Sequence, residues 1–236
     1  MAAKKEGQAS ERIVSEVKRR ILGWVYPPEH PLIEESLSRE FGVSRSPVRE
    51  ALRMLEADGF VRRIPNRGYY VRQVRLQEVA DLYEVRLALE LFALEKLAAM
   101  PEKHPEVRRL AGIWRAPPRL EHPEAESLAL VSQKFHEDLV ELAGNASLLD
   151  TLRRVDERLF AFRIMGFEQA IEQGTLETSS RNHLALSEAI LSKDPAVIRP
   201  ALERTIAHGR SNVEQAMGKA LTRAYSGLAP MGRLVR

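Results

Sequence analysis

The chain has 236 residues, a formal net charge of +3 and no cysteine. The lack of cysteine excludes disulfides and thiolate metal sites and is typical of a reducing compartment. No run approaches the roughly 20 apolar residues of a membrane span, and the polar start of the chain lacks the apolar core of a signal peptide. We therefore expect a cytoplasmic protein with no membrane partner.

The charge is unevenly distributed along the chain. Residues 1–74 contain 14 Lys and Arg against 10 Asp and Glu, whereas residues 75–218 contain 18 against 23. A basic head on an acidic body is typical of a phosphate-binding module joined to a domain that does not bind DNA. Ordinary solvated charge would give a similar balance, so the distribution supports this interpretation without deciding it.

Three helices are predicted in the first 60 residues. Apolar residues at helical spacing indicate an amphipathic helix over residues 10–24. Residues 37–41 predict a short second helix, which Gly42 closes because glycine suits the position after a helix end. Ser44 is expected to cap a third helix, which ends at Asp58-Gly59.

A β-hairpin is predicted directly after these helices. Residues 60–64 and 69–74 are rich in β-branched and aromatic residues, and Pro65-Asn66-Arg67-Gly68 separates them as a turn. Helix, helix, turn, helix and hairpin follow one another in the order of a winged helix-turn-helix. The hairpin would then be the wing.

The rest of the chain predicts helices almost throughout. The expected fold is therefore mainly α, an N-terminal winged helix-turn-helix followed by an all-α bundle of six to seven helices. The expected helices lie near residues 76–99, 104–115, 124–143, 147–167, 175–192 and 195–217. The expected domains are residues 1–75 for DNA binding, 76–218 for ligand binding and dimerisation, and 219–236 as a basic C-terminal tail.

The third helix is the predicted recognition helix. Val48 and Leu52 are expected to point into the core, which leaves the polar residues of the same helix to project outward. An arginine there can form a forked contact with guanine or bind a phosphate, and the helix N-terminus itself favours an anion. The predicted DNA-binding residues are Ser44, Arg45, Ser46, Arg49, Asn66, Arg67 and Gly68. A helical hairpin with a solvated basic face is the alternative.

These segments carry a family resemblance. Residues 42–52 (GVSRSPVREAL), together with Asn66-Arg67-Gly68, resemble the GntR family of bacterial regulators, and residues 81–90 (DLYEVRLALE) resemble the start of the effector (FCD) domain of its FadR-type branch. The resemblance implies a homodimer, often a repressor, on a palindromic double-stranded operator, with DNA affinity altered by a small metabolite that is often an organic acid. Family members often have a base-reading arginine where this chain has Glu35.

The resemblance also implies an effector site within the bundle. Metal-binding members of the branch use an aspartate and three histidines, and the corresponding positions here are Ser132, His136, His183 and Thr205. With only two histidines and no carboxylate, this set suits zinc or nickel poorly. A metal ion would need His136, His183 and His208. We favour a metal-free pocket in which His136 and His183 donate hydrogen bonds to an effector oxygen.

Two arginines are further effector candidates. Arg86 is expected on a helix face with few other polar positions, and a guanidinium removed from water needs an anion. That anion is either a protein carboxylate, such as Glu90 or Asp156, or the carboxylate of an effector. Arg163 presents the same alternatives, or is simply exposed.

The sequence indicates a transcription regulator and not an enzyme. It contains no nucleophile elbow and no phosphate loop, so the two histidines are the only chemistry available for catalysis. The alternatives are a DNA-binding dimer without a functional effector site and, more weakly, a histidine-based metallo-hydrolase.

Overall fold

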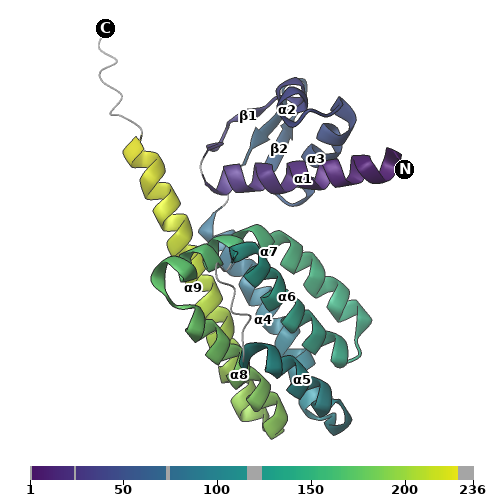
Figure 1. Cartoon of the computed structure of the whole chain (residues 1–236), viewed down its shortest axis with the longest axis vertical. Helices are drawn as coiled ribbons and strands as arrows, with labels where there is room; N and C mark the ends of the chain where they lie inside the picture. The colour runs from purple at the N-terminus through teal and green to yellow at the C-terminus, as the bar shows by residue number, and fades with distance from the viewer. Residues whose placement is uncertain (1, 24, 73–74, 116–123, 228–236) are drawn as a thin grey trace. The chain divides into compact units, whose positions relative to one another are not determined.

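The computed structural model describes residues 2–23, 25–72, 75–115 and 124–227 (Figure 1). The chain divides into two compact units, one comprising Met1–Arg75 together with Met217–Arg236 and the other comprising Leu76–Ala216. Within the described ranges, no helix is long and apolar enough to cross a membrane.

The first unit combines three helices with a small antiparallel sheet. The helices are α1 (Ala2–Leu22), α2 (Glu34–Phe41) and α3 (Arg45–Ala57), and the strands are β1 (Pro31–Leu32), β2 (Val61–Ile64) and β3 (Gly68–Val71). The strand order is β1-β3-β2, with Val61 opposite Val71 and Ile64 opposite Gly68. This arrangement confirms the predicted winged helix-turn-helix. The two-residue strand β1 was not predicted because it is too short to produce an alternating pattern.

The core of the first unit follows the predicted pattern, but the helix bounds and the expected cap differ from the prediction. Ile13, Val17, Val48 and Leu52 have no exposed surface. Helix α1 begins at Ala2, earlier than the predicted residue 10. Ser44 precedes α3 with extended backbone angles, but its side chain makes no capping hydrogen bond, so the predicted capping interaction is wrong.

The second unit consists of helices. They are α4 (Leu76–Ala98), the 3-10 turn η1 (Pro101–Lys103), α5 (His104–Arg115), α6 (Ala125–Leu142), α7 (Ala146–Gln173), α8 (Leu176–Ser192) and α9 (Pro195–Gly227) up to Ala216. The predicted helical bundle is confirmed. Helices α7 and α9 continue beyond their predicted ends at residues 167 and 217, so the start of the predicted tail is helical. Residues 228–236 of that tail lie outside the described residues.

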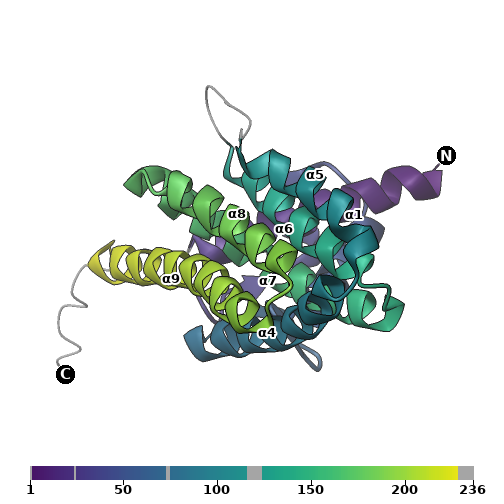
Figure 2. The same cartoon turned by 90° about the horizontal axis from the view of Figure 1, so that it is seen from below.

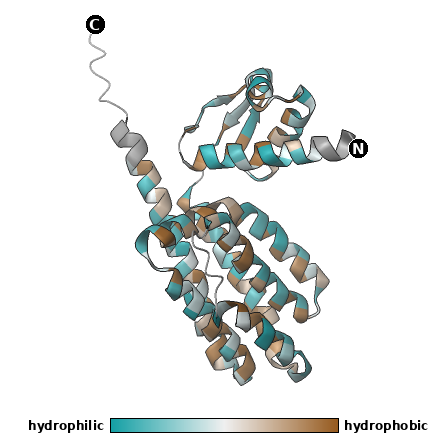
Figure 3. Cartoon of the chain, viewed as in Figure 1, coloured by the Kyte–Doolittle hydropathy of each residue, from teal (hydrophilic) through white to brown (hydrophobic). Residues whose placement is uncertain are grey.

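Within the second unit, α6 packs on α7, α5 packs on α8, and α4 contacts α6, α7 and α8 (Figure 2). Hydrophobic and hydrophilic residues recur along the same helices, as amphipathic packing requires (Figure 3). Helices α7 and α9 approach closely at Gly166, where an added Cβ would lie 3.0 Å from Cγ2 of Val213. Glycine at this position therefore permits the contact between the two helices.

Candidate DNA-contact face and effector pocket

The polar side of α3 lies open to solvent. Val48 and Leu52 are fully buried, whereas the side chains of Arg45 and Arg49 are 56% and 57% exposed. Ser46, next to Arg45, is also exposed. The helix therefore has the division into a buried and an outward face that a recognition helix needs.

Both arginines of this face are paired with carboxylates of α2. Nη2 of Arg45 lies 3.4 Å from Oε2 of Glu35, and Nε of Arg49 lies 2.7 Å from Oε2 of Glu34. The sequence did not predict these pairs, because they join helices whose relative placement is a tertiary property. Exposed ion pairs contribute little to stability, so a DNA phosphate or base can replace either carboxylate at small cost.

The predicted wing tip forms the tight turn between β2 and β3. Asn66 and Gly68 have positive φ values of 61° and 91°, and the N–H of Arg67 donates to the carbonyl of Ile64 at 3.0 Å. The side chain of Arg67 is exposed. The turn thus presents a cation at its outermost point, while Gly68 adopts a backbone conformation that few other residues tolerate.

One pocket in the second unit collects every residue predicted for the effector site. The cavity has a volume of about 50 Å³. Its lining includes all six candidates: Arg86, Ser132, His136, Arg163, His183 and Thr205. His208 also lines it, as do Tyr83, Asn182 and Asn212, which the sequence did not indicate. The alternative that Arg163 is exposed is wrong, since its relative exposure is 4%.

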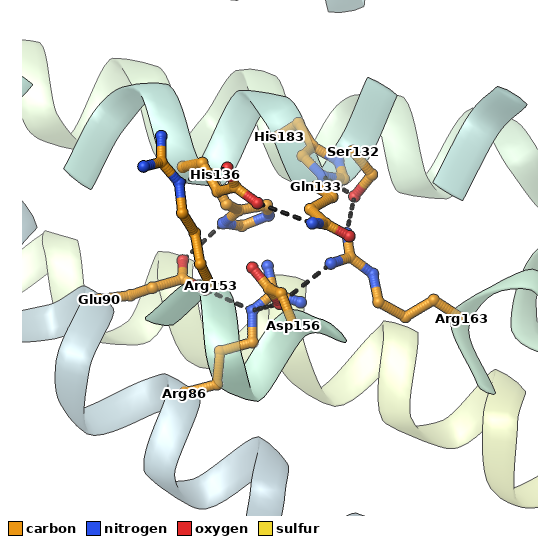
Figure 4. Close-up of polar contacts among 10 residues, drawn as sticks. Arg86, Glu90, Ser132, Gln133, His136, Arg153, Asp156, Arg163 and His183 are labelled. Carbon is orange, nitrogen blue, oxygen red and sulfur yellow. Dashed lines mark hydrogen bonds and ion pairs between the residues drawn. The ribbon is translucent and has the colours of Figure 1, made fainter. Parts of the chain in front are cut away.

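Two arginines and two carboxylates form a buried network beside this pocket (Figure 4). Nε of Arg86 lies 2.5 Å from Oε1 of Glu90 and 3.5 Å from Oδ1 of Asp156. The same Asp156 oxygen accepts a hydrogen bond of 3.1 Å from Nη1 of Arg163. Both protein carboxylates considered for Arg86 are therefore its partners. Within the described residues, Nη2 of Arg86 and Oδ2 of Asp156 are buried without a hydrogen-bond partner.

Ser132 links this network to His183. Nη2 of Arg163 donates to Oγ of Ser132 at 3.2 Å, and Nε2 of His183 lies 3.2 Å from the same oxygen. Nδ1 of His183 lies 2.7 Å from the carbonyl oxygen of Ser179, which can only accept, so Nδ1 carries the proton. Nε2 of the neutral ring is then an acceptor for the Ser132 hydroxyl.

His136 also carries its proton on Nδ1. Its Nδ1 donates to Oε2 of Glu90 at 2.5 Å, which leaves a lone pair on Nε2. The expectation that neutral His136 and His183 donate to an effector oxygen is therefore wrong, because each ring already donates its single N–H to a protein oxygen. The positively charged hydrogen-bond donors in the pocket lining are the two guanidinium groups, and Tyr83, Asn182 and Asn212 add neutral donors.

The network is formally neutral when both histidines are neutral. Burial lowers the pKa of His136 and lowers that of His183 further, although Glu90 partly opposes this at His136. Burial alone would raise the pKa of Glu90, but Arg86 and His136 outweigh it and lower the pKa to about 2. For Arg86, the carboxylates of Glu90 and Asp156 outweigh burial and raise its pKa. Two cations thus balance two anions.

The donor set does not fit a divalent metal ion. The described residues contain no group of three or more His, Cys, Asp or Glu side chains placed to hold one. Ser132 and Thr205 supply only hydroxyls, and Ser132 already accepts from the Arg163 guanidinium. A metal cation at Ser132 would also be repelled by the positive charge of the Arg163 guanidinium. A metal-based interpretation of the pocket is therefore not supported by its chemistry.

Two family models match the chain. The model of bacterial regulatory proteins of the gntR family matches residues 9–71, and the FCD domain model matches residues 81–208, more than half of the chain. The chain belongs to the GntR family. It is a DNA-binding transcriptional regulator with an FCD effector domain, and the family resemblance inferred from the sequence is confirmed.

Individual GntR regulators agree with this assignment. The uncharacterized HTH-type transcriptional regulator YdhC of Bacillus subtilis is 27% identical over 202 residues, which is 85% of this chain and 87% of that protein. The gluconate operon transcriptional repressor of Bacillus subtilis is 26% identical, over 86% and 84% of the two chains. A solved structure of Lar, which controls the agr system of Listeria monocytogenes, superposes with a TM-score of 0.61 at 20% identity, over 87% of this chain and 96% of that one.

Proposed function

We propose that this GntR-family protein binds a palindromic operator as a homodimer, and that a small organic acid bound in the FCD-domain pocket controls its affinity for DNA. The observation that carries the effector proposal is the pair of buried guanidinium groups in the pocket lining. Arg86 keeps one buried Nη2 donor without a partner among the described residues. A ligand carboxylate can accept a hydrogen bond from this Nη2, because its oxygens fit the planar fork of a guanidinium.

The pocket also suits a hydroxyl group on the same acid. The lone pair of His136 Nε2 can accept from a ligand hydroxyl, while the arginines take the carboxylate. A hydroxy acid would bind His136 through its hydroxyl and the arginines through its carboxylate. The relative named as a gluconate operon repressor supports including gluconate among the compounds to test.

The experiment is a thermal-shift screen of small carboxylates followed by operator binding. Gluconate, lactate, malate, succinate and acetate are added to the full chain, since any ligand that binds only the folded state raises the unfolding midpoint. An acid that stabilises the protein must also change operator affinity, and the DNA complex must change the affinity for the acid by the same factor. Stabilisation without an effect on DNA binding would contradict the proposed control.

DNA binding is tested separately at α3. An operator selected from random duplexes is titrated with Arg45→Ala, Arg49→Ala and the control Arg53→Ala, an exposed arginine at the other end of the same helix. We expect each of the first two changes to cost about 1–3 kcal/mol if the arginine contacts a base. A base contact also relaxes sequence preference, whereas a phosphate contact weakens all sequences alike. Equal affinity of all three variants and the parent protein would refute the predicted recognition helix.

A further inference from the structure

Trp114, on α5, lies next to a pocket residue but does not line the pocket. The indole is 4% exposed and stacks on the ring of His183, with the ring centroids 3.8 Å apart and the planes 13° from parallel. Among the described residues, those that line the pocket come from α4, α6, α7, α8 and α9, and α5 contributes none. Helix α5 packs on α8, and the stack with His183 joins it to the pocket.

The indole contributes its ring and not a hydrogen bond. Its Nε1 is buried without a hydrogen-bond partner among the described residues, and a buried donor left unpaired costs free energy. A purely apolar side chain would fill this place without that cost, so the flat ring face is the feature that distinguishes tryptophan here. Phe135 contacts both rings edge to face, with its centroid 5.8 Å from that of Trp114 and 5.2 Å from that of His183. The three rings thus confine His183.

The plane of the His183 ring decides whether its two nitrogens reach their partners. Nδ1 donates to the Ser179 carbonyl, and Nε2 accepts from the Ser132 hydroxyl (Figure 4). A hydroxyl has one hydrogen and two lone pairs, so a Ser132 that donates to His183 keeps its lone pairs for Nη2 of Arg163. A His183 ring turned out of this plane would deprive the Ser132 hydroxyl of its acceptor, and Arg163 would lose a fixed partner.

We propose that Trp114 is a positioning residue of the effector site, which acts through His183 and Ser132 to hold the Arg163 guanidinium in place for a ligand carboxylate. This inference rests on the proposed function, which supplies the carboxylate. It adds a residue outside the pocket that sets the affinity for the acid. The alternative is that Trp114 only fills the core beside α8, and two experiments distinguish these roles.

The first test observes the protons of His183 by NMR of the full chain labelled with ¹⁵N-histidine, without added acid. The parent protein should carry the His183 proton on Nδ1 alone, and the signals lost in His183→Gln assign this ring. We expect Trp114→Leu to show a second population protonated on Nε2, because the ring is no longer held in its plane. Trp114→Phe keeps a flat ring and should retain the parent signals.

Leu110→Ala is the control, since it truncates another buried residue of α5. Circular dichroism checks that each variant is folded, and Trp114→Met, which keeps more of the volume without a flat ring, replaces Trp114→Leu if that variant is unfolded. Unchanged His183 signals in the folded variant would overturn the proposal. The same change in Leu110→Ala would also overturn it, because it would show a general loosening of α5.

The second test is a double-mutant cycle measured by isothermal titration calorimetry with gluconate, lactate, malate, succinate and acetate. For an acid that binds the parent protein, Trp114→Leu should raise the Kd about fivefold, the factor that corresponds to the energy of a typical aromatic pair. In a Ser132→Ala background, the same change should alter the Kd by less than about twofold, because both residues act through one chain of hydrogen bonds.

The outcomes of this cycle are separable from those of the proposed function. If the effects of Trp114→Leu and Ser132→Ala on the Kd multiply, the path through Ser132 is wrong while the acid site stands. If none of these acids binds the parent protein, the proposed function fails, and the tautomer of His183 alone decides whether Trp114 positions the ring.

Discussion

The charge balance beside the pocket is best tested by Asp156→Asn. Asp156 is fully buried and accepts from Arg163 at 3.1 Å, with Arg86 at 3.5 Å. Asparagine keeps the size of the side chain and one acceptor oxygen but removes the negative charge. Glu90 still neutralises Arg86, so the variant leaves one guanidinium buried without a counter-ion.

Breaking a buried ion pair by removing one partner costs about 3–5 kcal/mol. The retained acceptor oxygen places Asp156→Asn at the lower end, about 3 kcal/mol. For a unit of this size, 1 kcal/mol shifts the unfolding midpoint by about 3 °C, so we expect a fall of roughly 10 °C. An added carboxylate should recover part of this loss and should stabilise the variant more than the parent protein, because the pocket now has an excess positive charge.

The assay is differential scanning calorimetry with and without the acid that gives the largest shift in the parent protein. Asp150→Asn is the control, because Asp150 is an exposed aspartate on the same helix, α7. A midpoint of Asp156→Asn within about 2 °C of that control would refute the view that Asp156 balances a buried cation. Equal stabilisation of the variant and the parent by the acid would refute the view that the acid binds at the arginines.

Two further predictions concern pH and the DNA-contact face. The pKa values of His136 and His183 are lowered in the folded protein, so the unfolded chain binds protons first, and the free energy of unfolding should fall as pH decreases below about 6.5. Urea titrations should show a slope of up to about 1.4 kcal/mol per pH unit for each histidine. The His183→Gln variant should have a smaller slope, and a pH-independent stability would contradict this. Glu35→Gln removes a negative charge beside Arg45, so operator affinity should rise about threefold at low salt and less at high salt, as expected for an exposed charge. Fluorescence anisotropy measures this change, and a loss of affinity would instead indicate that the Glu35 carboxylate contacts the DNA.

Much of the fold was predictable because it is encoded in local patterns. The apolar periodicity of residues 10–24, the Gly42 helix end and the turn at Asn66-Arg67-Gly68 each depend on neighbouring residues, and each predicted its element. Helix ends were less predictable. Helix α7 continues to Gln173 and α9 to Gly227 although Gly166 and Gly218 lie beside the predicted limits. An isolated glycine is tolerated inside a helix, and a pattern of apolar residues does not by itself mark a helix end.

The family resemblance pointed to Ser132, His136, His183 and Thr205, and all four line one pocket with Arg86 and Arg163. Only the tertiary structure decided what these residues can do. Glu90 and the Ser179 carbonyl fix the protons of His136 and His183, so the rings accept where the sequence suggested that they donate. Contacts such as His136 with Glu90, 46 residues apart, arise from the packing of helices, and local periodicity specifies which face of a helix is buried but not which side chain lies opposite.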